Sequence, residues 1–307
     1  MAGAGALVAL VVAYRRQRVD EAGAHREATR LHTERFSQAV DKLGSDSPAV
    51  RLGGVHALAG LADDAPDINL RQTCIDVLCA YLRLPFPADP VDLPDLLPGG
   101  TPPTEEQREA QQDKKDRYRA MREVRHTIMR LIGDHYRVPE GAHRSWQGCN
   151  LDLTGVTIDG SVVFSGATFS DGSVVFSGAT FSGGSISFSG ATFSGGRVDF
   201  SKTTFTGGSV SFRNARFSGG RVSFFGATFT SGSVDFTNTT FAGGILDFRY
   251  ARIVGHILDF SYARVTDGEM DFSNATGLVP EGLLGAVGTP VPRTVILASA
   301  WRPPSVP

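Results

Sequence analysis

The strongest constraint on the fold is a 12-residue sequence motif, here called a phrase, that recurs between positions 161 and 277. Phenylalanine fills one position of this phrase without a gap, at Phe164, Phe176, Phe188, Phe200, Phe212, Phe224, Phe236, Phe248, Phe260 and Phe272. A second column lies five residues further on, at Phe169, Phe181, Phe193, Phe205, Phe217, Phe229 and Phe241, and continues with Ile253 and Val265. Such fixed-period similarity predicts a solenoid, whose units bury their apolar side chains only against their neighbours.

Each half of the phrase reads as a small or apolar residue, a variable residue and a phenylalanine. Val174 and Phe176 show this in one half, and Ala179 and Phe181 in the next. Because side chains alternate between the two faces of an extended chain, both members of each pair point the same way. We therefore expect short strands whose phenylalanines form the core. Glycine pairs such as Gly195-Gly196 separate the phrases, and we expect them to supply positive φ at corners.

The segment ATFSG at residues 179–183 resembles the repeat of the pentapeptide-repeat family, in which a small residue, a polar residue and phenylalanine or leucine precede two more. The resemblance implies a right-handed, quadrilateral β-helix with phenylalanine pointing inward on each side. A coil of one phrase would be too flat for two phenylalanines, so we expect about 24 residues per coil, longer than is usual in the family, and bulges at two opposite corners. Some five coils with a rise of about 4.8 Å would form a rod about 25 Å long.

The repeats belong to a longer chain, for which the sequence predicts an α+β fold. The β-helix should cover residues 146–277, with degenerate first repeats as its cap. Residues 278–307 should form the other cap, with Val295, Ile296, Leu297 and Trp301 folding back. Caps are expected because an open solenoid end exposes unpaired strand edges.

A helical module is predicted at residues 19–83. One helix should cover residues 19–43, and a second should begin at Pro48 with Ser47 as its N-cap. A third is expected from Arg71 to Arg83, and the last two resemble a single HEAT or armadillo-like unit.

Prolines then mark residues 84–104 as a linker, and a further helix is predicted at residues 105–138. Its apolar side chains share one face, at Met121, Val124, Ile128, Leu131 and Ile132. We expect this face to dock against the earlier helices.

Residues 1–18 form an apolar segment, in which residues 2–14 are followed at once by Arg15, Arg16 and Arg18. As a helix, residues 2–14 would extend about 20 Å, whereas the hydrocarbon core of a membrane is about 30 Å thick. We interpret the segment as the end of a transmembrane anchor, with the arginines keeping the bulk of the chain in the cytoplasm. The alternative is a cytoplasmic chain with a frayed, apolar first helix.

Composition limits the classes of function. The net charge of -2 gives no general attraction to nucleic acid. The three cysteines have no spacing typical of a disulfide framework or zinc site and suit a reducing compartment. Only four of the 30 basic residues are lysines, a bias typical of high-GC bacterial, for example actinobacterial, chains.

A search for catalytic patterns gives none. The histidines are dispersed, and His256 stands where other phrases have a corner glycine. The repeated glycines precede strands rather than a helix, so they do not predict a phosphate loop. We therefore expect no enzyme, no cofactor, no metal and no small-molecule substrate.

Two columns of residues should point outward. In a coil of about 24 residues, Asp247 lies beside Asp271 and Asp235 beside Asp259. These four residues are our candidate interaction surface, as a solvated face or as a site for a cation or a basic partner. The other column is mostly threonine, a good exposed strand residue, interrupted by arginine.

The resemblance and these columns predict a non-catalytic scaffold that binds an unknown protein partner and is tethered to the membrane by its N-terminus. Some members of the family are similar to DNA in shape and charge and inhibit type II topoisomerases such as gyrase. That is the alternative, but residues 146–277 carry acidic and basic residues in nearly equal number.

Overall fold

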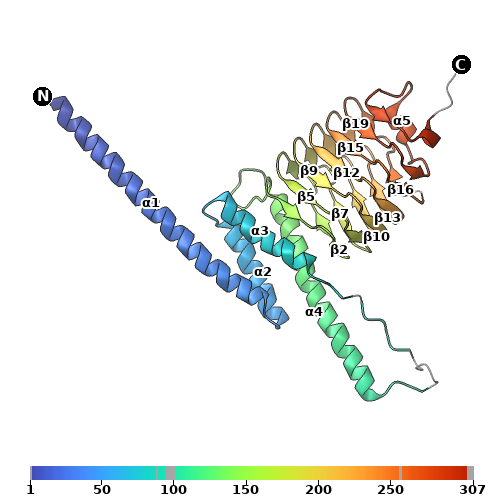
Figure 1. The fold of residues 1–307 in the computed structure, drawn as a ribbon, viewed down its shortest axis with the longest axis horizontal. Helices are drawn as coiled ribbons and strands as arrows, with labels where there is room; N and C mark the ends of the chain where they lie inside the picture. The colour runs from blue at the N-terminus through green and yellow to red at the C-terminus, as the bar shows by residue number, and fades with distance from the viewer. Residues whose placement is uncertain (1, 88, 95–100, 256–257, 303–307) are drawn as a thin grey trace. The chain divides into compact units, whose positions relative to one another are not determined.

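The computed structural model describes residues 2–87, 89–94, 101–255 and 258–302. Helices precede a β-solenoid along the chain, so the fold is α+β, as predicted (Figure 1). The chain divides into two compact units, Met1–Ile75 and Asp76–Pro307, and the division falls within helix α3 (Ile68–Arg83). His256 lies outside the described residues.

Helices α1 (Ala2–Leu43) and α2 (Pro48–Asp63) belong to the first unit. α2 begins at Pro48, as predicted, whereas α1 is one uninterrupted helix through both segments that the sequence analysis separated. The two helices pack closely because Gly54 has no side chain: a Cβ there would lie 2.6 Å from the backbone nitrogen of Leu43. Within the described part of the chain, no helix combines the length and apolarity required to cross a membrane.

Local hydrogen bonds fix where the next two helices begin. α3 begins at Ile68, earlier than predicted, because the Asp67 carboxylate accepts hydrogen bonds from the backbone N–H groups of Asn69 and Leu70. α4 (Glu105–Tyr136) begins at the predicted residue. Thr104 and Gln107 form a capping box there, in which each side chain bonds the backbone N–H of the other.

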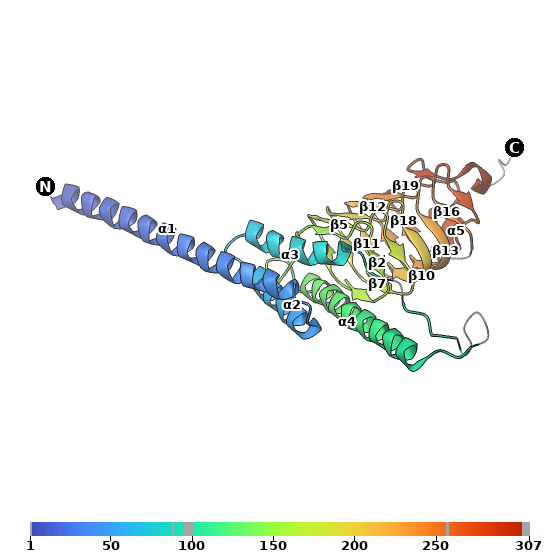
Figure 2. The same ribbon diagram turned by 60° about the horizontal axis from the view of Figure 1, so that its bottom comes forward.

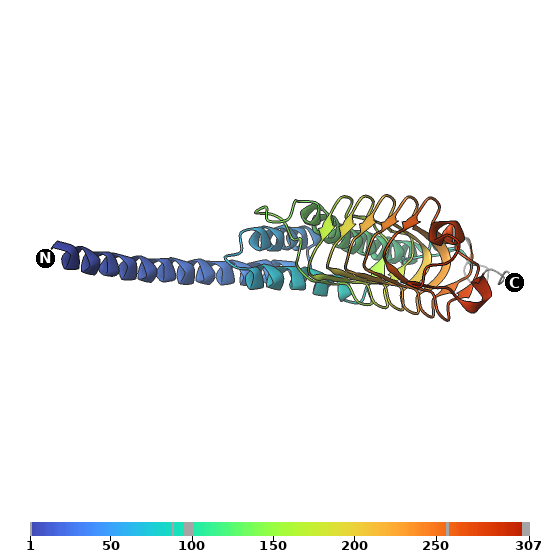
Figure 3. The same ribbon diagram turned by 90° about the horizontal axis from the view of Figure 1, so that it is seen from above.

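The solenoid follows α4. One coil runs through four short strands and returns above its start: β5 (Ser173–Val175), β6 (Thr180–Phe181), β7 (Ser185–Ser187), β8 (Thr192–Phe193) and then β9 (Arg197–Asp199). Val174 pairs in parallel with Val198, which gives the predicted coil of about 24 residues. There are about 6 turns, rather than the five expected, stacked along the solenoid (Figure 2, Figure 3).

The same path repeats in every coil. The remaining strands are β1 (Leu151–Asp152), β2 (Thr157–Ile158), β3 (Val162–Val163), β4 (Thr168–Phe169), β10 (Thr204–Ser211), β11 (Arg216–Phe217), β12 (Arg221–Ser223), β13 (Thr228–Asp235), β14 (Thr240–Phe241), β15 (Ile245–Asp247), β16 (Arg252–Ile253), β17 (Leu258–Asp259), β18 (Arg264–Val265), β19 (Glu269–Asp271), β20 (Thr276–Gly277) and β21 (Val295–Ile296). We number the four sides of the solenoid after the first coil, so that side 1 contains β1 and side 4 contains β4. Side 1 is β1-β5-β9-β12-β15-β19-β21, side 4 is β4-β8-β11-β14-β18, and β10 and β13 each run across sides 2 and 3.

Two kinds of corner alternate around the coil. The tight corners, after sides 1 and 3, hold a residue with positive φ, such as Gly178 (φ 67) or Asn214 (φ 58). The wide corners, after sides 2 and 4, carry the glycine pairs, and the pairing of β10 with β13 slips in register around Thr206. Gly195 is required by close approach rather than by φ, because a Cβ there would lie 2.1 Å from the carbonyl oxygen of Ser170 in the previous coil.

The phenylalanines of both columns form the core of the solenoid. Each is at most 3% exposed. Rings of the same side stack along the solenoid, as Phe212 does on Phe236 with a centroid distance of 4.8 Å and an interplanar angle of 2°. Rings of opposite sides meet edge to face, as Phe212 after side 3 and Phe224 after side 1 do at 6.3 Å. Such pairs each contribute about 0.5–1.5 kcal/mol beyond the burial of area.

Helix α4 covers the first coil, which the sequence analysis did not predict, and Arg125 Nη1 on α4 also donates to the carbonyl oxygen of Leu82 at the end of α3, at 2.6 Å. It packs on β3, and a Cβ on Gly133 would lie 2.8 Å from the carbonyl oxygen of Val163. The buried Tyr136 ring lies 5.4 Å from Phe164 and 5.8 Å from Phe169. The apolar face of α4 therefore packs on the end of the phenylalanine stack. Met121, which was predicted to belong to this face, is only half-buried.

The other end is closed by the C-terminal segment, through helix α5 (Leu283–Val287), β21 and a short 3-10 helix, η1 (Ser299–Trp301). β21 pairs with β19, and Val295 and Leu297 are buried, while Ile296 is exposed. The Trp301 ring lies 5.7 Å from Phe272 and its Nε1 donates to the carbonyl oxygen of Gly277 at 3.1 Å. The C-terminal segment therefore caps the last coil in two ways: β21 pairs with the backbone of β19, and Trp301 contacts the ring of Phe272.

Candidate functional site

The four acidic residues singled out in the sequence lie on two sides of the solenoid. Asp247 pairs in register with Asp271 on side 1, and Asp235 with Asp259 on side 3, as a 24-residue coil requires. They do not form a uniformly solvated column, because Asp247 is only 1% exposed. Asp199, on the same side, is also buried.

Two arginines explain the burial of Asp247. Its Oδ2 accepts hydrogen bonds from Arg221 Nη2 at 2.6 Å and from Arg249 Nη2 at 2.8 Å. Its Oδ1 accepts from the Nε and backbone N–H of Arg249 at 3.0 and 3.1 Å. Burial acts to raise the pKa of Asp247, but these hydrogen bonds outweigh it and hold the pKa below its ordinary value.

Asp199 has a similar environment. Arg197 Nη2 donates to its Oδ2 at 2.6 Å, and the hydroxyl and backbone N–H of Ser201 donate to its Oδ1. Burial again acts to raise the pKa of Asp199, and the bonds from Ser201 and Arg197 lower it further than burial raises it. Both aspartates are therefore carboxylates held beneath arginines.

We call Arg197, Arg221 and Arg249 the arginine cluster. Their side chains remain 55%, 38% and 39% exposed, while the side chains of Asp199 and Asp247 are 9% and 2% exposed. The cluster lines a hollow of about 280 Å³ on side 1, together with Ser201, Ser223 and Phe225. The charged atoms that reach solvent there are mainly guanidinium groups.

Phe225 lines this hollow at the tight corner after side 1, and Tyr250 lies beside Phe225. The Arg249 guanidinium lies 5.5 Å from the Phe225 ring, and the Tyr250 ring lies 5.5 Å from Phe225. Tyr250 has a positive φ of 59° and is 58% exposed, although Gly178 and Gly226 fill the equivalent position in other coils. A tyrosine in this conformation is strained, and the same backbone conformation recurs at other tight corners, as at Lys202 and Tyr262.

The acidic pair on side 3 is more loosely held. Arg213 lies 3.4 Å from Asp235, and Asp259 accepts hydrogen bonds from the backbone N–H of Ser261 and the hydroxyl of Thr237. Burial acts to raise the pKa of Asp259, and these bonds lower it overall. In the described part of the chain, no group of histidine, cysteine and acidic side chains is placed to hold a metal ion.

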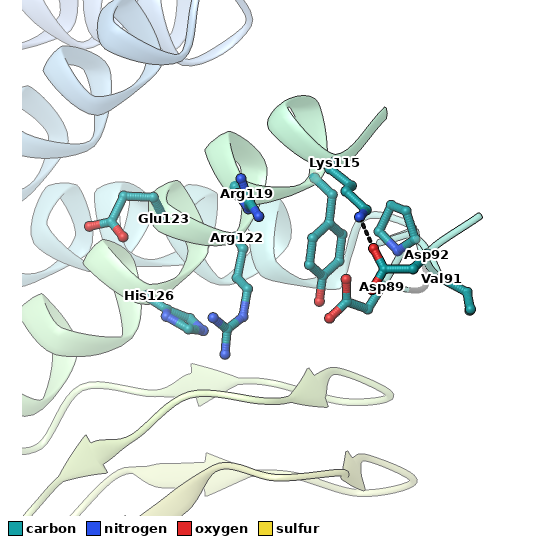
Figure 4. Close-up of a pocket in the computed structure, with 10 residues that line it drawn as sticks. Asp89, Val91, Asp92, Lys115, Arg119, Arg122, Glu123 and His126 are labelled. Atoms are coloured by element: carbon teal, nitrogen blue, oxygen red, sulfur yellow. Dashed lines mark hydrogen bonds and ion pairs between the residues drawn. The ribbon is translucent and has the colours of Figure 1, made fainter. Parts of the chain in front are cut away.

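A larger cavity, of about 740 Å³, lies between the linker and α4 (Figure 4). Its lining carries both signs of charge: Asp89, Asp92, Lys115, Arg119, Arg122, Glu123 and His126. Lys115 forms an ion pair with Asp92, drawn as a dashed line in the figure. Arg122 and His126 lie on α4 and point toward the solenoid.

Those two side chains share one carboxylate of the first coil. Arg122 Nε donates to Asp159 Oδ2 at 2.7 Å, and His126 Nε2 lies 3.2 Å from Asp159 Oδ1. Burial acts to raise the pKa of Asp159, but His126 and Arg122 together hold it at about 2. Gly160 fits against the same ring, since a Cβ there would lie 2.7 Å from His126. The cluster joins α4 to the first coil, and its charged groups are occupied with one another.

The sequence analysis missed both clusters, although each contains departures from the repeat. Phe225 stands where the same corner has serine at Ser177, Ser201 and Ser273, and Tyr250 stands where that corner has glycine, lysine or asparagine. Asp159 stands at a wide corner, where its pairing register places it against Ser182. These substitutions were the available signal, whereas their partners on α4 and in neighbouring coils could not be read from the spacing.

Comparison with known proteins agrees with this architecture. Residues 171–209 match the family model described as pentapeptide repeats (9 copies). No curated protein matches the chain significantly. The matched segment covers β5 to β9 and most of β10, where coils of phenylalanine-centred strands stack in register. The chain therefore contains pentapeptide repeats, which form part of its β-solenoid.

Proposed function

We propose that this protein is a non-catalytic scaffold that binds another protein through the sides of its solenoid. The observation that carries the proposal is the stack of about 6 coils, closed at both ends and presenting four sides of paired strands. Stacked coils of this kind form extended, rigid binding surfaces. The two charged clusters support the non-catalytic part of the proposal, because their histidine, arginine and carboxylate side chains are bonded to one another.

Photo-crosslinking tests the proposal in cells of the source organism. p-Benzoylphenylalanine is placed at one outward residue per side: Ile245 on side 1, Thr204 on side 2, Ser209 on side 3 and Thr240 on side 4. A scaffold yields a discrete crosslinked protein from at least one side and not from all four equally. Absence of any discrete product from all four positions would contradict the function.

The tether to a membrane, expected from residues 2–18, is a separate proposal supported by the apolar sequence and the arginines after it. A tethered native chain stays in the membrane pellet after a carbonate wash, and recovery in the wash would argue against the tether.

Inhibition of a type II topoisomerase by imitation of DNA is less well supported. Such a mimic needs an acidic outer surface, whereas on side 1 the arginines cover Asp199 and Asp247. We expect no inhibition in a DNA-supercoiling assay.

A further inference from the structure

We propose that the arginine cluster, with Phe225 and Tyr250, is the surface on which the solenoid binds a short acidic segment of its protein partner. This inference rests on the scaffold function proposed above and assigns that function to one side and one class of partner. It is carried by the exposed charge, the fixed positions of the guanidinium groups and the aromatic corner beside them.

The exposed charge is the first argument. Three cations stand over two carboxylates that are almost completely covered, Asp247 at 1% and Asp199 at 6% exposed. A third carboxylate, Asp271, lies 3.8 Å from Arg249 at the edge of the cluster. An approaching partner therefore meets guanidinium N–H groups. Guanidinium groups bind carboxylates with paired, charge-assisted hydrogen bonds.

The guanidinium groups are also held in place. Arg197 and Arg221 lie in register on the adjacent strands β9 and β12. Each bonds a buried aspartate, at 2.6 Å in both cases. Because these side chains are already ordered, binding costs less conformational entropy than it would at free surface arginines.

The aromatic corner provides apolar contact next to the charge. Phe225 lies under Arg249, and Tyr250 leans on Phe225 while keeping 58% of its surface exposed. Arginine and tyrosine are the residues that dominate the energetics of protein interfaces. A partner segment that places an apolar side chain beside its carboxylates fits this combination.

The charge along side 1 favours a short segment over a long polyanion. Beyond Arg221 the register continues through Ile245 to Glu269, and Asp247 is followed by Asp271. The sign of the exposed charge thus reverses two coils after Arg221. A nucleic acid lying along this side would meet repulsion there, whereas a short acidic peptide would not.

Fluorescence anisotropy with the full-length native protein tests the inference. The probe is a short fluorescein-labelled peptide of aspartate and glutamate with one central phenylalanine. Arg221→Gln should weaken binding about tenfold or more, as expected for the loss of a charge-assisted hydrogen bond. Phe225→Ser, which leaves every ion pair intact, should also weaken it. Arg216→Gln makes the same change of charge on side 4, where Arg216 is exposed, and should leave the affinity unchanged.

Three outcomes would overturn the inference: no binding of the peptide by the native protein, equal losses for Arg221→Gln and Arg216→Gln, or displacement of the peptide by inorganic phosphate at equimolar concentration. The second would indicate general charge attraction, and the third a small-oxyanion site. Crosslinking from side 2, 3 or 4 alone would also overturn it while leaving the scaffold function intact, so the two failures are distinguishable.

Discussion

Arg221 Nη2 donates to Asp247 Oδ2 across 2.6 Å, and the two residues belong to adjacent coils, 26 positions apart in the sequence. The bond joins Arg221, a member of the arginine cluster, to the carboxylate that positions it. Because Arg249 bonds the same carboxylate, a single buried aspartate orders two exposed cations.

Removing the Asp159 carboxylate, which joins α4 to the first coil, should make the free energy of unfolding depend less on pH in the acidic range. Asp159 has a pKa of about 2, below its ordinary value of 3.8, so its contribution is complete above about pH 4 and is lost as the pH falls toward 2. At pH 7, Asp159→Asn should lower the free energy of unfolding by about 1.5 kcal/mol, the lower end of the range for hydrogen bonds to charged groups.

Chemical unfolding of the native protein and the Asp159→Asn variant at pH 7 and near pH 2.5 checks this. The difference should shrink at the lower pH. The exposed Asp171 supplies a control, since Asp171→Asn should change little at either pH. A difference that grows on acidification would show that Asp159 has the opposite linkage.

The core assignment predicts unequal costs for two phenylalanines. Phe212 is fully buried in the stack, so Phe212→Ala should destabilise the protein by about 3–5 kcal/mol. Phe225 is half-buried at a corner, and Phe225→Ala should cost far less. Thermal or denaturant unfolding measures both, and equal costs would be inconsistent with a core of inward phenylalanines.

Close approach of coils predicts contrasting results for two wide-corner glycines. Gly195→Ala should destabilise the protein by about 1–3 kcal/mol, because the added Cβ would lie 2.1 Å from the carbonyl oxygen of Ser170. Gly183→Ala meets no atom within 4 Å, and its φ is not in the left-handed region. This control should be neutral or slightly stabilising. If both variants melt alike, the coils are not packed as described.

Strain at the tight corners predicts that some natural side chains lower stability. Tyr262 has a φ of 60° and is 82% exposed, whereas Asn238 tolerates the same conformation in the preceding coil of that corner. Tyr262→Asn should stabilise the protein by about 1 kcal/mol. The reverse change, Asn238→Tyr, should destabilise it. Calorimetry decides, and a loss of stability for Tyr262→Asn would mean that its ring makes contacts of its own.

Much of the solenoid was predictable because its determinants are local and repeated. The interval between Phe164 and Phe176 fixes the phrase, and the space needed for two phenylalanines fixes a coil of two phrases. From that coil length the pairing of Asp247 with Asp271 follows by counting. The number of coils was underestimated because the degenerate first repeats and β21 add pairing strands at the two ends.

The docking of α4 and the burial of Asp247 depend on contacts that the spacing of residues in the sequence does not encode. The apolar face of α4 is evident in the sequence, but nothing in it distinguishes the end of the phenylalanine stack from the earlier helices as its partner. The burial of Asp247 depends on Arg221 in the preceding coil. A column of aspartates therefore does not by itself predict a solvated face.

The central claim, that the arginine cluster and its aromatic corner bind a partner, is tested most directly by Tyr250→Asn. The change relieves the strain at φ 59° and removes the exposed ring beside Phe225. We predict a higher melting temperature together with weaker binding of the acidic peptide. Tyr262→Asn relieves the same strain at the other tight corner and should raise the melting temperature without altering binding. Unchanged affinity in the Tyr250→Asn variant, or equal weakening in both variants, would contradict the account.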